Sequence, residues 1–519
     1  MQYMFVIIYL IYIFMRMKKS MHMLQQNFYN NSNRYIKWIF KNKTKSFLTL
    51  DLLFIFALFL GFLIKEEIFV MIIFYLFVSF LYFNKNKKEA VKISFKVTAR
   101  VKRMITTFFL ITCALFYGCS YLDAFYALLL LGMYASFNNF VIFFVNVINK
   151  PIEKCVYYYY FNKAKTKIND MPRLNVIGVT GSYGKTSSKN ILSDILNVKY
   201  DTMPTPKNFN TPYGLMITIN NHLDKFTEYF IAEMGACEVG QVKELCDFVH
   251  PKYGILTTIG VAHLDSFKSE ENIQKTKFEL IESLPSDGIG ILNMDDPKQT
   301  SYHLKNDCMI KWISTKNKDA DIYASNIKGT SNGMCFDVQF KDDDKKYKLE
   351  TKLLGSANVY NIMAAVLLAK SLGMNMEEII RGVRGIKTIE HRLEMKKMAN
   401  LNIIDDAYNS NPVGAKMAVE TLGLMPGKKV IITPGMIELK EKQYELNYAL
   451  GTQIAQVCDL VILVGKNQTK PIYEGLLASN YPKTQIYVFD DVFEAFNVVR
   501  GMKDAYVLLE NDLPDLFNE

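Results

Sequence analysis

A short stretch in the middle of the chain combines a glycine-rich turn with a lysine and hydroxyl side chains. An apolar, β-branched run at 176–180 leads into the turn, and a helical pattern follows it. Backbone N–H groups of such a turn and the N-terminus of the next helix bind phosphate, while lysine and threonine contact phosphate oxygens and Mg²⁺. The stretch therefore predicts a nucleoside triphosphate site. Its residues are Gly181, Ser182, Tyr183, Gly184, Lys185, Thr186 and Ser187.

The glycine spacing departs from that of the common phosphate-binding loop. The common loop has a glycine five positions before Gly184, where Val179 stands, and the first glycine here is Gly181. The alternative interpretation is a tight strand-to-helix turn with a surface lysine. The residues further along the chain distinguish a nucleotide site from such a turn.

The first 170 residues differ in composition from the rest of the chain. They hold 22 Lys and Arg against 7 Asp and Glu, whereas the remaining residues hold 39 against 44. The apolar runs lie in the same region, so the basic excess indicates membrane topology and not nucleic-acid binding. The eight cysteines include no Cys-x-x-Cys pair, which argues against a zinc site or a disulfide framework.

Four apolar runs in this region, at 47–64, 68–83, 105–122 and 124–148, approach or exceed the length that crosses a bilayer as a helix. Short polar links join them into two expected transmembrane hairpins. The segment between the hairpins, 84–103, is strongly basic, which favours a cytoplasmic position for it and for the region after the hairpins. A set of buried core helices is the alternative. An earlier run, 4–15, is shorter than a span and is interpreted as an interfacial or partial membrane segment, and not as a cleaved signal.

After Pro172, short β-rich runs alternate with helical patterns, which is typical of an α/β fold with a parallel sheet. Three chemically capable residues follow in order. Glu233 and His263 each come after a predicted strand, and Lys277 lies on a predicted helix. The carboxyl ends of parallel strands share one edge of a sheet, where ligands bind. Taken singly, each residue could equally be structural.

The order of phosphate loop, strand-end Glu, strand-end His and then Lys resembles the Mur ligase family. The runs at 233–236, 259–264 and 277–279 are most similar to the branch that adds D-alanyl-D-alanine. The resemblance extends from about Asn175 to the C-terminus. It implies a phosphate-loop central domain at 171–386 and a Rossmann-like C-terminal domain at 387–519, after a membrane region at 1–170.

The resemblance also implies a chemistry, in which ATP phosphorylates a carboxylate and an amine attacks the acyl phosphate to give an amide. Lys185 would contact phosphates, and Thr186 and Glu233 would bind one Mg²⁺. His263 would help to bind a second Mg²⁺. Lys277 matches a lysine that the family carries as a carbamate, which would make it an anionic metal ligand. Lys185, His263 and Lys277 are therefore the expected catalytic residues.

Further residues match family positions on the nucleotide and the substrate. Asn361 would hydrogen-bond to adenine. Arg392 would contact the ATP phosphates, and Asp406 would contact the ribose. The family usually has His where Ala357 stands, and an N-cap role for Asn358 is a structural alternative. The expected substrate contacts are Asn208, Asn210 and Asn409, although the first two could be turn residues.

Two departures concern the substrates. Gly435 and Lys440 stand where the D-alanyl-D-alanine-adding pattern has Asp and Gly, and the membrane region replaces the family's uridine-binding domain. We expect a multi-pass membrane ligase with cytoplasmic catalytic domains that joins an amino acid or dipeptide to a small-molecule or lipid-linked cell-wall precursor. The alternatives are another acceptor, such as poly-glutamate, and a membrane-tethered scaffold that binds nucleotide without ligation.

Overall fold

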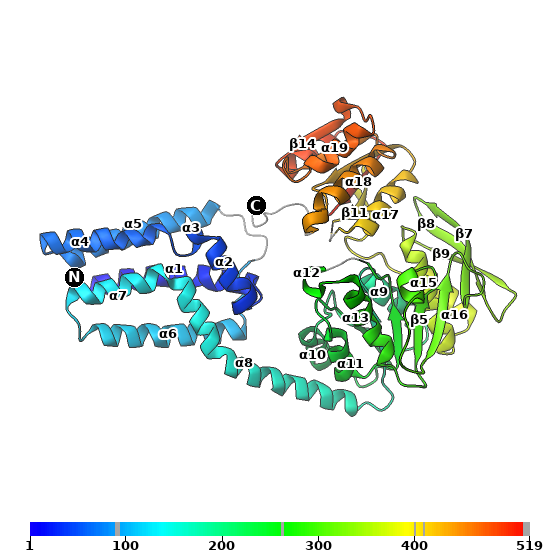
Figure 1. Ribbon diagram of the computed structural model, residues 1–519, viewed down its shortest axis with the longest axis horizontal. Coiled ribbons are helices and arrows are strands. Elements are labelled where there is room, and N and C mark those ends of the chain that lie inside the picture. The colour runs from blue at the N-terminus through cyan, green and yellow to red at the C-terminus, as the bar shows by residue number, and fades with distance from the viewer. Residues whose placement is uncertain (89–93, 261–263, 399–400, 408–409, 438, 512–519) are drawn as a thin grey trace. The chain divides into compact units, whose positions relative to one another are not determined.

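The computed structural model describes residues 1–88, 94–260, 264–398, 401–407, 410–437 and 439–511. His263 and Asn409 lie outside these residues. The chain forms a helical N-terminal unit, Met1–Tyr159, and an α/β unit that begins at Tyr160 (Figure 1).

In the described residues of the N-terminal unit there are eight α-helices and two short irregular helices, and the last α-helix continues past Tyr159. A buried ion pair, Arg16 with Asp51 at 3.0 Å, joins the first helix to the η2 turn. The elements are α1 Gln2–Gln26, η1 Asn31–Tyr35, α2 Ile36–Lys41, α3 Lys43–Ser46, η2 Leu50–Leu53, α4 Phe54–Ile64, α5 Glu67–Lys88, α6 Ala99–Cys119, α7 Ala124–Ser136 and α8 Asn138–Asn169.

By length and composition, two helices in the described part of the chain could cross a bilayer, at Glu67–Asn84 and Ala99–Cys119. A third is possible if α7 and α8, bent by 76° at their junction, count as one span. The first predicted run, 47–64, instead gives a shorter apolar helix, Leu50–Ile64, which begins with the η2 turn that carries Asp51. By length and composition, the described residues therefore contain two or three candidate spans and not the four or so that the sequence predicts.

Polar residues near the α7–α8 junction serve packing. Asn139 is buried, accepts a hydrogen bond from the Tyr35 hydroxyl at 2.8 Å and donates one to Ser46 O at 2.9 Å. The run 4–15 is part of the longer α1, which buries one face that includes Tyr9, Tyr12 and Met17. It is thus a packed helix of this unit.

The first sheet of the α/β unit has nine strands in the order β2-β3-β1-β4-β5-β6-β7-β8-β9. The strands up to β7 pair in parallel, while β8 pairs antiparallel with β7 and β9. The strands are β1 Asn175–Thr180, β2 Thr202–Pro204, β3 Tyr229–Glu233, β4 Tyr253–Leu256, β5 Ile289–Asn293, β6 Met309–Ser314, β7 Ile322–Thr330, β8 Gly333–Phe340 and β9 Lys346–Thr351.

Helices flank this sheet, and α9 and α15 bury their apolar residues in a common core with β1 and β4 (Figure 1). Buried β-branched residues such as Ile177, Val179 and Ile255 explain why the central strands form there. The helices are α9 Lys185–Leu196, α10 Pro212–Asn221, α11 Gln241–Val249, α12 Leu264–Phe267, α13 Glu270–Glu282, α14 Pro297–Thr300, α15 Ala357–Ser371 and α16 Met376–Arg384.

A second sheet of six strands follows, in the order β10-β11-β15-β12-β13-β14. It is parallel except for the hairpin of β10 and β11, which confirms the predicted α/β class of this C-terminal part. Its elements are β10 Glu394–Met398, β11 Leu401–Asp406, α17 Pro412–Gly423, β12 Lys428–Thr433, η3 Lys440–Lys442, α18 Gln443–Ala455, β13 Leu460–Val464, α19 Lys470–Ala478, η4 Lys483–Gln485, β14 Ile486–Phe489, α20 Val492–Val499 and β15 Ala505–Glu510.

Candidate active site

The loop between β1 and α9 depends on two glycines with positive φ. Gly181 has a φ of 149°, and a Cβ there would lie 1.9 Å from Thr257 Oγ1. Gly184 has a φ of 82° and is the N-cap of α9. The Thr257 hydroxyl donates to Tyr183 O at 2.6 Å and the Ser182 hydroxyl to Gly260 O at 2.8 Å, so β4 and the segment after it support the loop. Its turn and the first residues of α9 contain all seven predicted phosphate-site residues.

The Lys185 ammonium folds back over this loop. Its Nζ donates to Gly181 O at 2.8 Å and to Ser182 O at 3.0 Å. Burial lowers the pKa of Lys185, and a bound anion would offset that effect. The lysine is therefore held at the N-terminus of α9, where a phosphate would bind.

The Glu233 carboxylate is the centre of the site. It lies at the end of β3, beside the end of β1, and its side chain is 2% exposed. Its Oε1 accepts hydrogen bonds from Thr186 Oγ1 at 3.1 Å and Asn210 Nδ2 at 3.2 Å. Its Oε2 accepts one from Lys189 Nζ at 3.1 Å. Two segments distant in sequence from β3, helix α9 and the loop that carries Asn210, thus converge on one buried carboxylate.

Thr186 and Glu233 are spaced as two neighbouring Mg²⁺ ligands would be. Octahedral ligands about 2.0–2.1 Å from Mg²⁺ lie about 3 Å from each other, and these two oxygens are 3.1 Å apart. Within the described residues, no group of three or more His, Cys, Asp or Glu side chains forms a metal site. A hydroxyl, one carboxylate and phosphate oxygens are a donor set that suits Mg²⁺.

Lys277 lies on α13 with its side chain 3% exposed and its Nζ 5.7 Å from the centre of the Phe267 ring. Burial, with a smaller contribution from the nearby Lys185 charge, lowers the pKa of Lys277 to about 7. Both lysines face one cavity of about 230 Å³. The cavity is lined by Gly181, Ser182, Lys185, Asn210, Thr211, Gly235, Ala236, Cys237, Gln241, Phe267 and Lys277.

The two predicted substrate asparagines differ in position. Asn210 lines the cavity and contacts Glu233, and its carbonyl accepts a hydrogen bond from Gly235 N at 2.7 Å. Asn208 is exposed and does not line the cavity. The structure therefore brings one of the two into the site.

Gly235→Ala is expected to displace Asn210, because a Cβ at residue 235 would lie 2.7 Å from the Asn210 side-chain Cγ. We expect a stability loss of about 1–3 kcal/mol and a weaker contact between Asn210 and Glu233. Thermal unfolding of the full chain checks the first effect. Gly240→Ala is a useful comparison, because Gly240 has a positive φ but a Cβ added there would meet no atom within 4 Å. Unchanged thermal stability of Gly235→Ala would contradict the predicted clash, whereas a loss in Gly240→Ala measures only the cost of a Cβ on a left-handed backbone, which Gly235 does not have.

Asn361, on α15, lies against the phosphate loop. Its Oδ1 is 3.4 Å from the position that a Cβ on Gly184 would take, and its Nδ2 donates to Asn358 Oδ1 at 3.2 Å. Asn358 is not the N-cap, because Ser356 precedes the helix and Asn358 donates to Leu354 O from within it. The pair places an amide next to the loop.

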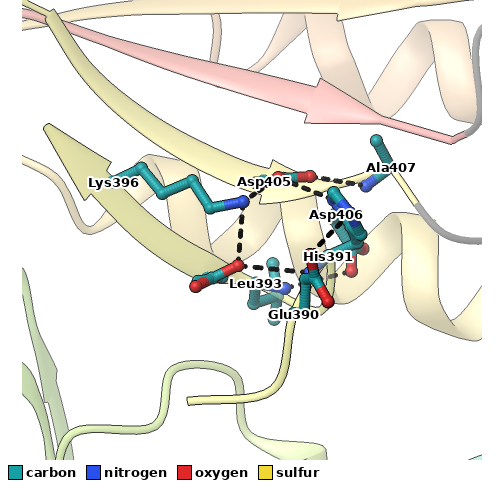
Figure 2. A network of polar contacts seen from close by, with 8 residues as sticks. Glu390, His391, Leu393, Lys396, Asp405, Asp406 and Ala407 are labelled. Atoms are coloured by element: carbon teal, nitrogen blue, oxygen red, sulfur yellow. Dashed lines mark hydrogen bonds and ion pairs between the residues drawn. The ribbon is translucent and has the colours of Figure 1, made fainter. Parts of the chain in front are cut away.

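Arg392, in the C-terminal domain, lies in a turn whose neighbours have left-handed backbones, with φ of 58° at His391 and 48° at Leu393. Two adjacent carboxylates hold this turn (Figure 2). His391 Nδ1 lies 2.8 Å from Asp405 Oδ2, and Leu393 N donates to Asp406 Oδ1 at 3.1 Å. Polar contacts on both sides of Arg392 therefore fix an otherwise unfavourable conformation.

The carboxyl group of Asp406 also has an unusual pKa. Burial and the nearby Glu510 charge raise the pKa of Asp406 to about 7. Glu510 is itself buried, with Thr433 Oγ1 donating to its Oε2 at 2.5 Å. A neutral Asp406 carboxyl could donate a hydrogen bond to a ribose hydroxyl as well as accept one.

Lys189 and Asp405 were missed by sequence reasoning. Lys189 is one turn beyond Lys185 on α9, and its spacing from Lys185 was the available signal for a shared helix face. Asp405 directly precedes Asp406 at the end of β11.

Both domains of the α/β unit match known protein families. Residues 179–369 match the Mur ligase middle domain, and residues 391–509 match the Mur ligase glutamate ligase domain. The UDP-N-acetylmuramoyl-tripeptide–D-alanyl-D-alanine ligase of Bacillus subtilis (strain 168) is 31% identical over 296 residues, which cover 56% of this chain and 63% of that protein. The Escherichia coli (strain K12) ligase of the same name is 30% identical over 294 residues, covering 56% and 64%.

Among solved structures, the MurF ligase from Thermotoga maritima in complex with ADP superposes with a TM-score of 0.61 at 25% identity. The superposition covers 69% of this chain and 80% of that one. The chain spans a little under two thirds of the length of the two curated relatives.

Proposed function

Because the chain belongs to the Mur ligase family, we propose that it is an ATP- and Mg²⁺-dependent ligase that joins a carboxylate to an amine. One observation carries this proposal. The Thr186 hydroxyl and the Glu233 carboxylate lie 3.1 Å apart beside the phosphate loop, at one edge of a parallel sheet.

The proposed reaction has two steps. A carboxylate oxygen of the acceptor attacks the terminal phosphorus of ATP, giving an acyl phosphate and ADP. The amine then attacks the acyl carbon, which releases phosphate and forms the amide. Bound Mg²⁺ supplies charge neutralisation at the phosphates.

The residues of this chain orient and stabilise the reactants. Lys185 and the loop N–H groups bind the phosphates, and Thr186 with Glu233 would hold Mg²⁺. Asn210 and Lys277 line the adjoining cavity, which suits the carboxylate end of the acceptor. Asn361, Arg392 and Asp406 are proposed for the nucleotide, and the second Mg²⁺ role of His263 and the substrate role of Asn409 remain part of the proposal.

The acceptor and the added group follow from the relatives. Their names specify D-alanyl-D-alanine and a UDP-N-acetylmuramoyl-tripeptide, so we take this pair as the first candidates for this chain. A lipid-linked precursor or poly-glutamate is the alternative acceptor. Helices α5 and α6 support a position at the cell membrane with the ligase domains on the cytoplasmic side.

Phosphate release and product mass decide among these possibilities. The full chain, purified in detergent, is incubated with ATP, Mg²⁺, D-alanyl-D-alanine and UDP-N-acetylmuramoyl-tripeptide. Formation of the pentapeptide product supports the first candidate. Turnover with only a lipid-linked acceptor or poly-glutamate selects the alternative. ATP binding without phosphate release under any pairing contradicts ligation and supports a scaffold.

Lys277 gives a prediction about pH. A carbamate forms when a neutral lysine amine attacks CO₂ and loses one proton, so it requires the deprotonated amine. Because the pKa of Lys277 is lowered to about 7, the neutral fraction falls about tenfold from pH 8 to pH 6. We expect bicarbonate-stimulated turnover to fall across this window, as measured by initial rates with and without bicarbonate.

The control is Lys277→Arg, whose side chain stays protonated. It should have low activity and no response to bicarbonate at any pH. Equal bicarbonate stimulation in Lys277→Arg would show that the effect does not arise at residue 277.

A further inference from the structure

Lys189 is a fully buried lysine that the proposed reaction does not use. Its side chain is 1% exposed, and burial lowers its pKa. The ammonium has two partners, Glu233 Oε2 at 3.1 Å and the backbone carbonyl of Lys207 at 2.5 Å. One side chain thus connects the candidate metal ligand to a loop on the substrate side.

The loop at 205–210 surrounds Glu233 through further contacts. The Thr205 hydroxyl accepts a hydrogen bond from Glu233 N at 3.2 Å, and Asn210 Nδ2 donates to Glu233 Oε1. Lys207 has a φ of 49°, a left-handed conformation that a residue other than glycine keeps only when its surroundings hold it. The Lys189 ammonium contacts the carbonyl of this residue.

The two carboxylate oxygens of Glu233 have different environments. Oε2 receives the cation of Lys189, whereas Oε1 lies next to the Thr186 hydroxyl. With Oε2 held by Lys189, Oε1 is the oxygen placed to bind Mg²⁺ together with Thr186. If Glu233 moves when it binds a cation, the Lys189 ammonium moves with it. The hydrogen bond from Lys189 to the Lys207 carbonyl then changes as well.

We propose that Lys189 is a positioning residue that couples Mg²⁺ binding at Glu233 to the conformation of the acceptor loop 205–210. The inference rests on the proposed function, because it takes Glu233 as a Mg²⁺ ligand. The loop carries Asn210, which lines the cavity, so the metal orders the acceptor side of the site through Lys189. By linkage, a bound acceptor would tighten Mg²⁺ binding to the same degree.

Hydrogen exchange of the full chain in detergent, read by mass spectrometry, tests the coupling without an acceptor. The chain is measured alone, with ADP, and with ADP and Mg²⁺. In the wild type, we expect ADP to slow exchange at 182–188, and added Mg²⁺ to slow exchange at 205–210 by about fivefold or more. In Lys189→Met, the effect at 182–188 should persist and the Mg²⁺ effect at 205–210 should disappear.

Two variants control for unrelated effects. Lys199→Met removes a partly exposed lysine just beyond α9, paired with Gly373 O and Glu378, and should behave as wild type. Lys189→Arg keeps the cation and should restore at least part of the Mg²⁺ effect at 205–210. A merely structural lysine would leave the Mg²⁺ dependence of exchange unchanged once the variant is folded.

The outcomes separate the two proposals. Unchanged exchange at 205–210 when Mg²⁺ is added to the wild type with ADP overturns the coupling, even if Lys189→Met does not fold. A full Mg²⁺ effect in Lys189→Met also overturns it. No slowing at 182–188 in the wild type would overturn nucleotide binding, and with it both proposals.

Discussion

Lys185→Ala is expected to lower kcat/KM for ATP by about 10²–10³-fold, because it removes the only ammonium on the phosphate loop itself. The folded state should be little affected. The ammonium contacts only two loop carbonyls in the described structure, and alanine is the best helix former. Initial rates of phosphate release and calorimetric ADP binding measure the two consequences.

Lys199→Ala provides the matched comparison for this variant. Lys199 lies three residues beyond α9 and donates to Gly373 O at 2.6 Å, away from the cavity lining. Its loss should leave ATP turnover within about twofold of wild type. If Lys185→Ala retained wild-type turnover, the loop would not be the phosphate site.

Glu233→Gln should affect activity and stability separately. Removing the carboxylate charge weakens Mg²⁺ binding, so turnover should fall by about 10²–10³-fold. It also leaves the buried Lys189 cation without its anion, at a cost of about 3 kcal/mol. Exchange protection of the α9 amides should therefore fall by about a hundredfold.

The double variant Glu233→Gln with Lys189→Met separates these two effects. With both buried charges gone, much of the lost protection in α9 should return, since a buried pair is often replaceable by neutral groups. Turnover should stay low, because no carboxylate remains for the metal. Recovery of turnover in the double variant would show that Glu233 acts only by neutralising Lys189.

The central strands could be predicted because they are buried on both faces. Runs such as 176–180 and 460–464 are rich in β-branched residues and contain no charged residue, and the structure has strands at β1 and β13. The residues after such strands fall at one edge of the sheet by topology alone. This is why Lys185, Thr186 and Glu233 could be placed together from the sequence.

Long-range charge pairs could not be predicted in the same way. A lysine one turn into a helix is normally solvated, and Lys189 is buried because Glu233 reaches it from 44 residues away. The helix predicted from the first apolar run, 47–64, is shorter than expected for a similar reason. It begins only at Leu50, with the η2 turn, in which Asp51 pairs with the buried Arg16 of α1.

The antiparallel part of the first sheet was also missed. Strand β8 alternates buried and partly exposed residues, and much of β7 and β9 is exposed, so these strands lack the continuous apolar run of a buried parallel strand. Their pairing depends on the two turns that connect them.

The strand order of the nine-stranded sheet leaves β2 and β9 at its two edges. β2 is only three residues long and ends at Pro204, which has no N–H to donate to a further strand. β9 presents exposed lysines at Lys346 and Lys348 along its length. Both features discourage a second molecule from extending the sheet, so crowding many copies together should not lead to fibrous aggregation through this domain.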